Sequence, residues 1–196
     1  GWAEGAVGVN TNYHNFMYAN VDFDKGKRLR DYRIMAAFSE VSDALDEICD
    51  DAIVTDEKGN VIDLQFKDDV DLSNLQKEEL KKEFKQFINH FDLETKGWEI
   101  FRKLLVDGEI FFEHIIHEEH PEAGVLGSVE IPTEVIDPIF DNIQNNIIKG
   151  FLLRRPVINP ATNTLEKMEY IPFDKNQITY IHSGIWNEDK TLRLPF

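Results

Sequence analysis

Two hydrophobic periods meet at Gly108 in the segment Gly97–Ile116, and this junction constrains the fold more than any other part of the sequence. Before the glycine, apolar residues at helical spacing predict a short amphipathic helix with Thr95 as its N-cap and Gly108 as its C-terminal cap. These apolar residues are Trp98, Phe101 and Leu105. After the glycine, Glu109–Glu118 has the composition of a strand. A helix that leads directly into a strand predicts a mixed fold.

Two further helical patterns precede this junction. From Lys27 onward, apolar residues step by four and three, which predicts one surface helix with an acidic outer side. The stripe consists of Ile34, Phe38, Val41, Leu45, Ile48 and Ala52. Cys49 falls on the same side, where a buried, inert thiol is expected. Ser73 and Gln76 form a capping box that opens the next helix, and its apolar face consists of Leu80, Phe84, Phe87, Ile88 and Phe91.

The remaining patterns predict strands. Ile53–Val54 and an alternating run of Ile62, Leu64 and Phe66 flank turn residues around Gly59, which predicts a hairpin. Further strands are expected at 125–131, 147–154, 166–171 and 178–182, with a turn at 121–124 and a loop at 155–164. The expected fold class is therefore α+β, with a helical first half packed on mostly antiparallel short strands.

The sequence divides into two parts by composition. Residues 1–30 are expected to form an N-terminal arm, which docks through its aromatic residues Tyr13, Phe16, Tyr18 and Phe23. Residues 31–196 are expected to form one domain. A chain of 196 residues buries roughly 70% of its extended surface on folding. The first residue is Gly1 and not methionine, which indicates a fragment or a processed product.

The net charge of −16 restricts the possible functions. Nucleic-acid binding depends on Lys and Arg side chains that neutralise phosphates, and this chain has 21 basic against 37 acidic residues. The acidity is expected to serve solubility, or to repel a polyanion from the surface. No apolar run is long enough to span a bilayer, and no signal peptide is visible.

One cluster of residue types could carry chemistry, namely His114, His117 and His120 with the neighbouring Glu113, Glu118 and Glu119. On a strand, His114 and His117 point to opposite faces, as do His117 and His120, and His114 and His120 lie roughly 20 Å apart. One metal ion could not bind all three at ligand distances near 2 Å. His182 and Ser183 are adjacent but lack an oxyanion-hole motif, and no nucleotide-binding loop is present. The sequence therefore predicts no catalytic residue, metal site or cofactor.

An ordered set of segments resembles the portal protein of T4-like tailed bacteriophages. It includes the junction segment, in which IFRKLLVDGEIFFEHII is the closest match. The other segments are Asp31–Arg33, Glu40–Ile48, Asp51–Val54, Leu80–Phe91, Ile136–Pro138, Tyr170–Phe173 and Ile178–Gly184. They occur in the order of the family and cover Asp31–Gly184.

The resemblance implies a structural role without enzymatic activity. Such portals form a dodecameric ring at one vertex of the phage head, through which double-stranded DNA is packaged and ejected without sequence-specific binding. Major capsid and scaffold proteins surround the ring, and the terminase motor and neck proteins dock on it in turn. The implied location is the portal vertex of the virion, after synthesis in the bacterial host cytoplasm. The stem, clip and crown of a full portal are absent, so the chain resembles the amino-terminal wing.

Two other readings of the sequence remain. The first is an acidic protein-interaction domain that is unrelated to portals and shares only the α+β pattern. The second is a metal-dependent hydrolase that uses His114, His117 and His120. Ring assembly of the complete protein separates the portal reading from both, and a metal titration identifies the hydrolase.

Overall fold

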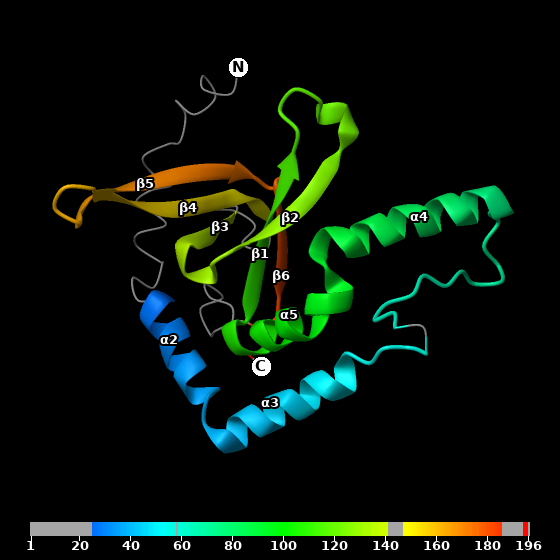
Figure 1. The fold of residues 1–196 in the computed structure, drawn as a ribbon, viewed down its shortest axis with the longest axis horizontal. Coiled ribbons are helices and arrows are strands. Elements are labelled where there is room, and N and C mark those ends of the chain that lie inside the picture. The colour runs from blue at the N-terminus through cyan, green and yellow to red at the C-terminus, as the bar shows by residue number, and fades with distance from the viewer. Residues whose placement is uncertain (1–24, 58, 141–146, 186–193, 196) are drawn as a thin grey trace.

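A computed structural model of the chain describes residues 25–57, 59–140, 147–185 and 194–195. Within them, helices come first and two small sheets follow, which confirms the α+β fold class (Figure 1). The helices are α2 Lys25–Met35, α3 Ser39–Ala52, α4 Asn74–Phe91 and α5 Leu93–Asp107. The strands are β1 Glu109–Ile116, β2 Val125–Ile131, β3 Ile136–Phe140, β4 Ile148–Asn159, β5 Thr164–Asp174 and β6 Ile178–His182. Single turns of 3₁₀-helix, η2 Pro121–Ala123 and η3 Thr133–Val135, flank β2.

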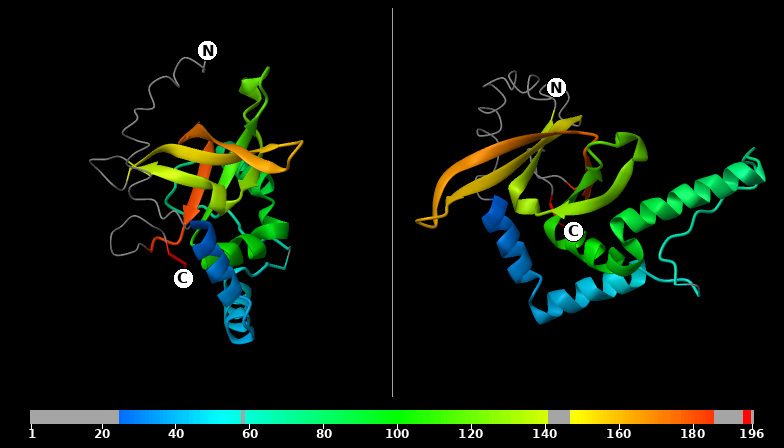
Figure 2. Two further views of the ribbon diagram at one scale, coloured as in Figure 1. Left: turned by 90° about the vertical axis from the view of Figure 1, so that its left-hand side faces the viewer. Right: turned by 45° about the horizontal axis from the view of Figure 1, so that its top comes forward.

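Both sheets are antiparallel and have three strands, in the orders β2-β1-β6 and β3-β4-β5. Strands β4 and β5 run across the direction of β1 and β6, so the two sheets cross (Figures 1 and 2). Phe111 of β1 packs between them, with its ring 5.9 Å from that of Phe151 and 4.8 Å from that of Tyr180. The core around it also includes Ile131, Ile136 and Ile178.

The junction between helix and strand has the predicted form. Helix α5 ends at Asp107, Gly108 takes a left-handed conformation with φ 80°, and β1 begins at Glu109. A Cβ atom at position 108 would also lie 2.6 Å from the Leu194 carbonyl oxygen. Glycine is therefore required there both for the left-handed backbone and for the close approach of Leu194. Both faces of β1 are buried over its first four residues, because Ile110 and Phe112 pack with Phe91 of α4 on the side away from Phe111.

The predicted N-cap of α5 is wrong. The helix follows Asp92, which has φ 51°, and Thr95 lies inside its first turn with its amide directed to the Asp92 carbonyl at 3.2 Å. Asp92 is also the C-cap of α4, which ends at Phe91, so the two helices meet at one left-handed residue and no loop separates them. Sequence periodicity locates helices but does not show a junction this short.

The predicted capping box at the start of α4 is confirmed. The backbone amide of Gln76 donates to Ser73 Oγ at 3.3 Å, and the backbone amide of Ser73 donates to Gln76 Oε1 at 2.9 Å. Each of these bonds satisfies an amide that would otherwise have no partner at the helix start.

Replacing Ser73 with alanine is expected to lower the free energy of unfolding by about 1 kcal/mol, because it removes the side-chain acceptor at the cap. Chemical denaturation of the variant and the parent chain measures the difference. Ser39→Ala is the matched control, since the Ser39 hydroxyl contacts only the neighbouring Glu40 side chain and does not cap α3. Equal losses in both variants would contradict this account of the cap.

The hairpin predicted around Gly59 is wrong, although its turn is present. Gly59 has φ 84° and donates to the Asp56 carbonyl at 2.9 Å, but no strand forms on either side among the described residues. A two-stranded hairpin needs a third strand or a packed helix for stability. Val54 and Ile62 remain exposed, whereas Leu64 and Phe66 are half-buried, so the alternating run is only partly covered.

The loop predicted at 155–164 is also wrong over most of its length. Strands β4 and β5 extend to Asn159 and from Thr164, so the connection is 160–163, with φ 52° at Asn163. Pro156 is compatible with β4 because β3 pairs only as far as Leu153, and beyond that point β4 has a partner on one side alone. Strand β3, which contains Pro138, was not predicted.

The predicted N-terminal arm falls largely on residues 1–24, which lie outside the described part of the chain. Helix α2 begins at Lys25, inside the range assigned to the arm. Among the described helices, none has both the length and the apolarity that crossing a bilayer requires.

Candidate functional site

An elbow between α2 and α3 replaces the single helix predicted from Lys27. The helical bonds continue to Ala36, whose amide donates to Tyr32 O at 2.8 Å, and a new helix starts after Phe38, whose backbone is extended. The two helices diverge from this elbow, which we define as residues 36–38 (Figure 1). The apolar stripe therefore does not lie on one continuous surface.

Lys25 fixes the beginning of α2 to both sheets. Its side chain is only 4% exposed, and its Nζ lies 2.7 Å from Glu109 Oε1 of β1 and 2.7 Å from the Ile136 carbonyl oxygen of β3. Asp137 Oδ1 lies 3.4 Å away, and the ammonium group also stands over the Phe111 ring. Tyr180 of β6 donates to the second oxygen of Glu109 at 2.9 Å. One buried cation thus connects a helix and three strands.

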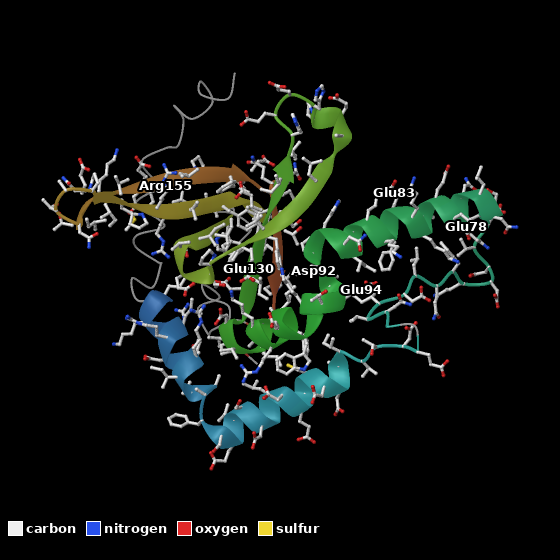
Figure 3. All side chains as sticks on the ribbon, in the orientation of Figure 1. Glu78, Glu83, Asp92, Glu94, Glu130 and Arg155 are labelled. Carbon is white, nitrogen blue, oxygen red and sulfur yellow. The ribbon has the colours of Figure 1, made fainter. Side chains whose placement is uncertain are left out.

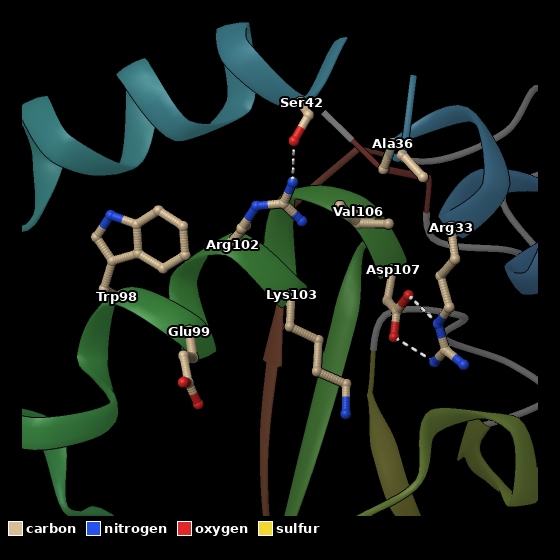
Figure 4. Close-up of a pocket in the computed structure, with 10 residues that line it drawn as sticks. Arg33, Ala36, Ser42, Trp98, Glu99, Arg102, Lys103, Val106 and Asp107 are labelled. Atoms are coloured by element: carbon tan, nitrogen blue, oxygen red, sulfur yellow. Dashed lines mark hydrogen bonds and ion pairs between the residues drawn. The ribbon is translucent and has the colours of Figure 1, made fainter. Parts of the chain in front are cut away.

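Arg33 fixes the other end of α2. It donates from Nε and Nη2 to the two oxygens of Asp107, at 3.0 and 2.7 Å (Figure 4). It also donates from Nη1 to Glu134. Asp107 is 1% exposed, so this fork-to-fork pair anchors the helix at the buried end of α5. Hydrogen bonding to Asp107 raises the pKa of Arg33 above its usual range, although partial burial opposes the shift.

Helix α3 packs on α5 through polar contacts and one buried thiol. Arg102 donates to Asp46 at 2.6 Å and to Ser42 at 3.0 Å, and the Trp98 indole donates to Asp50 at 2.8 Å. Cys49 is fully buried between them, as predicted, and desolvation raises the pKa of its thiol. Both arms of the elbow are therefore held against the same helix.

A groove of about 590 Å³ lies inside the elbow, between α2, α3 and α5 (Figure 4). Its cationic side chains already have acidic partners, because Arg33 pairs with Asp107, Arg102 with Asp46 and Lys103 with Glu130. Among the described lining residues, Ser42 carries the one hydroxyl, and it accepts a hydrogen bond from Arg102. The paired side chains of this lining favour a contact surface.

The outer side of the elbow is apolar and exposed. Ile34 is 59%, Phe38 58% and Ile48 49% exposed, and Val41 is also exposed. The prediction that the whole stripe packs inward is therefore wrong, since α3 directs Ser42, Asp46 and Cys49 toward α5. Exposed large apolar residues on two neighbouring helices favour an interaction surface.

Charge is divided sharply between the two arms of the elbow. Helix α2 contains five basic residues and one acidic residue, whereas α3 contains six acidic residues and no basic one. Residues 39–73 together hold twelve acidic and two basic residues, so they account for most of the net charge of −16. Figure 3 shows carboxylate oxygens along α3.

The predicted histidine cluster divides in the structure. His114 lies between β2 and β6, with Nδ1 3.1 Å from Ser128 Oγ and Nε2 2.9 Å from Thr179 Oγ1. The rings of His117 and His120 are 5.2 Å apart, although opposite faces of a strand were predicted. The reason is that β1 ends at Ile116 and the chain turns into η2. Among the described residues, no three His, Cys, Asp or Glu side chains converge as metal ligands.

His114 is expected to make stability depend on pH. Burial, and then the nearby His90, lower its pKa below 6.5, so the unfolded chain binds a proton more readily than the folded one. Stability is therefore present above about pH 6.5 and decreases as pH falls below that value. Denaturation at pH 7.5 and 5.5 should show a smaller loss for His114→Gln than for the parent chain. Equal losses would contradict this role.

The residues that fix the elbow were missed by local sequence patterns. Lys25, Asp107 and Glu109 are charged, and charged residues are normally placed on the surface. The one signal came from the segments that carry the family resemblance, since these contain Arg33, Asp137 and the Asp107–Glu109 stretch. Such segments coincide with the buried ion pairs that join α2 to the rest of the fold.

Comparison with known proteins gives a consistent result. A portal protein of Vibrio phage KVP40 is 29% identical over 170 residues, which cover 80% of this chain and 32% of that protein. A portal protein of Salmonella phage ViI is 22% identical over 152 residues, which cover 77% of this chain and 26% of that protein. The chain thus spans about a third or less of the length of these relatives.

The family model for the bacteriophage T4-like portal protein (Gp20) matches residues 25–194. This match begins at Lys25, the residue that anchors α2 to both sheets, and includes every described helix and strand. It covers far more than half of the 196 residues. The chain therefore belongs to the bacteriophage T4-like portal protein family.

Proposed function

We propose that this chain is the wing region of a portal subunit, a structural part of the ring at the capsid vertex through which double-stranded DNA enters and leaves. The main support is the family match over residues 25–194. The elbow supports it as well, because it presents an exposed apolar surface from helices that buried ion pairs hold in place. The role is mechanical, and none of the described side chains is assigned a catalytic step.

The proposed partners follow from the family. The complete protein assembles with further copies of itself into a dodecameric ring, and shell and scaffold proteins contact its periphery. The terminase motor and neck proteins dock through other parts of the subunit. The assembled portal vertex belongs to the virion, and the subunit is made in the cytoplasm of the bacterial host.

Duplex DNA is proposed to pass this region without being bound. The 37 acidic residues repel phosphates, and each Lys–phosphate contact that is avoided lowers the affinity for DNA and so favours sliding. Electrophoretic mobility shift with a duplex at physiological salt should show no complex with the chain. Tight binding there would contradict passive passage.

Electron microscopy of the complete subunit tests the central proposal. Expression of the full reading frame that contains this chain should yield rings with a central channel, whose wings accommodate the elbow and the crossed sheets. Particles that remain single subunits under conditions of capsid assembly would refute it. The acidic interaction domain and the hydrolase have no specific observation in their favour.

A further inference from the structure

We propose that the outer face of α2 in one portal subunit docks against the outer face of α3 in the next. This inference rests on the proposed ring, and it names the surfaces that meet where two wings are adjacent. The α2 face consists of Lys27, Arg30 and Ile34, and the α3 face consists of Glu40, Ala44, Glu47, Ile48 and Asp51.

The α2 face carries two basic residues and has an apolar end, with the exposed Asp31 at its border. Lys27, Arg30 and Ile34 follow each other at intervals of three and four, so they lie on one side of the helix. All three are exposed, whereas Lys25 and Leu29 on the opposite side are buried against the sheets and α5. Lys25 and Arg33, which pair with Glu109 and Asp107, do not belong to the outer face.

The α3 face is acidic with an apolar flank. Glu40 and Glu47 are seven residues apart, and Ala44, Ile48 and Asp51 follow the same side of the helix. All are exposed, while Ser42, Asp46 and Cys49 face α5. The face therefore combines exposed apolar area with a charge opposite to that of α2, which is what a docking partner for α2 requires.

The two faces cannot pair within one chain. Both helices are fixed against α5, α2 by Arg33 with Asp107 and α3 by Arg102 with Asp46, and they diverge from the elbow (Figures 1 and 2). A symmetric contact between two α3 outer faces would bring Glu40, Glu47 and Asp51 of one helix against the same three carboxylates of the other, and like charges at an interface oppose association.

A contact between α2 of one copy and α3 of the next is heterologous, and a heterologous contact closes into a ring when its rotation permits. One helix pair is small beside the roughly 800 Å² per partner of a stable interface. The contact is therefore proposed to set the spacing and orientation of the wings, while the rest of the subunit contributes to assembly. A basic segment of a shell protein is the competing occupant of the α3 face.

Site-directed crosslinking in the complete ring tests the contact. Subunits with Ile34→Cys and subunits with Ile48→Cys are co-expressed, assembled and treated with a short bismaleimide. Both positions are exposed, and the native Cys49 is buried. We expect crosslinked dimers between the two kinds of subunit, and none in rings that contain only one kind. The matched control combines Ile34→Cys with Phe87→Cys, an exposed apolar position on α4, and should not crosslink.

Charge reversal supplies a second readout on the same rings. Arg30→Glu or Glu47→Arg alone should lower the yield of the Ile34–Ile48 crosslink at least fivefold, and the two reversals on opposite sides of the contact should restore it. The reversals lie on exposed positions, so folding of each subunit is retained.

The outcomes separate this inference from the proposed function. Rings that form normally but give no Ile34–Ile48 crosslink would overturn the contact and leave the portal role intact. Crosslinking of Ile48→Cys to itself, to the α4 control position or only to a shell protein would also overturn it. Failure of the unmodified complete protein to form rings would refute the proposed function, and this inference with it.

Discussion

Replacing Lys25 with methionine is expected to lower the free energy of unfolding by about 3–5 kcal/mol. Methionine keeps most of the side-chain volume but removes the charge that pairs with the buried Glu109 at 2.7 Å, whereas the buried Asp137 keeps its ion pair with Arg154. A buried carboxylate without its cation costs far more than a broken surface ion pair. Urea or guanidinium denaturation of the 196-residue chain, monitored by tryptophan fluorescence, measures the loss.

Two control variants separate charge from packing at this site. Lys85→Met, on an exposed position of α4, should change stability by about 0.5 kcal/mol or less. Adding Glu109→Gln to Lys25→Met should recover part of the loss, since it neutralises the carboxylate that has lost its cation while the side chain keeps its shape. A Lys25→Met variant as stable as the parent chain would show that the buried cation does not fix α2.

Replacing Phe111 with alanine is expected to cost about 3–5 kcal/mol of unfolding free energy, because it leaves a cavity where the two sheets cross. Phe111 is fully buried, and its ring contacts those of Phe151 and Tyr180. It also lies beneath the ammonium group of Lys25 at 5.3 Å. The loss should appear in the denaturation midpoint and in weaker docking of α2, read by limited proteolysis at the arginines of that helix.

Phe38→Ala is the matched control for this core substitution. Phe38 lies on the outer side of the elbow and is 58% exposed, so its removal should change the stability of the single chain by about 0.5 kcal/mol or less. If Phe38→Ala and Phe111→Ala destabilised the chain equally, the crossing of the sheets would not be its core.

The two substitutions test different parts of the same arrangement. Phe111 joins the sheets, and Lys25 joins α2 to the sheets. Because α2 begins the elbow, both positions influence the outer faces without belonging to them. We therefore expect a destabilised Lys25→Met subunit to crosslink less between Ile34 and Ile48 in rings, even though neither crosslinked position is changed.

Local sequence patterns were reliable where the physics is local. The capping box at Ser73 and the change of period at Gly108 depend on residues within one turn, and both are present as predicted. Strand β6 follows its predicted bounds, since its composition and its neighbouring turns are sufficient to define it. The Gly59 turn formed as well, although the strands expected beside it did not.

Errors arose where a distant surface decides the outcome. The apolar stripe from Ile34 to Ala52 was read as one packed face, but the fold breaks it at residues 36–38 and leaves much of it exposed. The alternating run at Ile62 found no partner strand, whereas β4 and β5 extended past Pro156 because they found each other. Periodicity reports which residues could be buried, and it does not report what will cover them.

The sequence alone determined the fold class, the helix–glycine–strand junction, the acidic character and the family, because these depend on composition, neighbouring residues and the order of segments. Only the tertiary structure decided that Lys25 and Asp107 are buried, that α2 and α3 form an elbow, and that basic and acidic faces lie on its two arms. The physical reason is that burial of a charge depends on partners far away in the chain. Lys25 meets Asp137 across 112 positions, and no local pattern contains that contact.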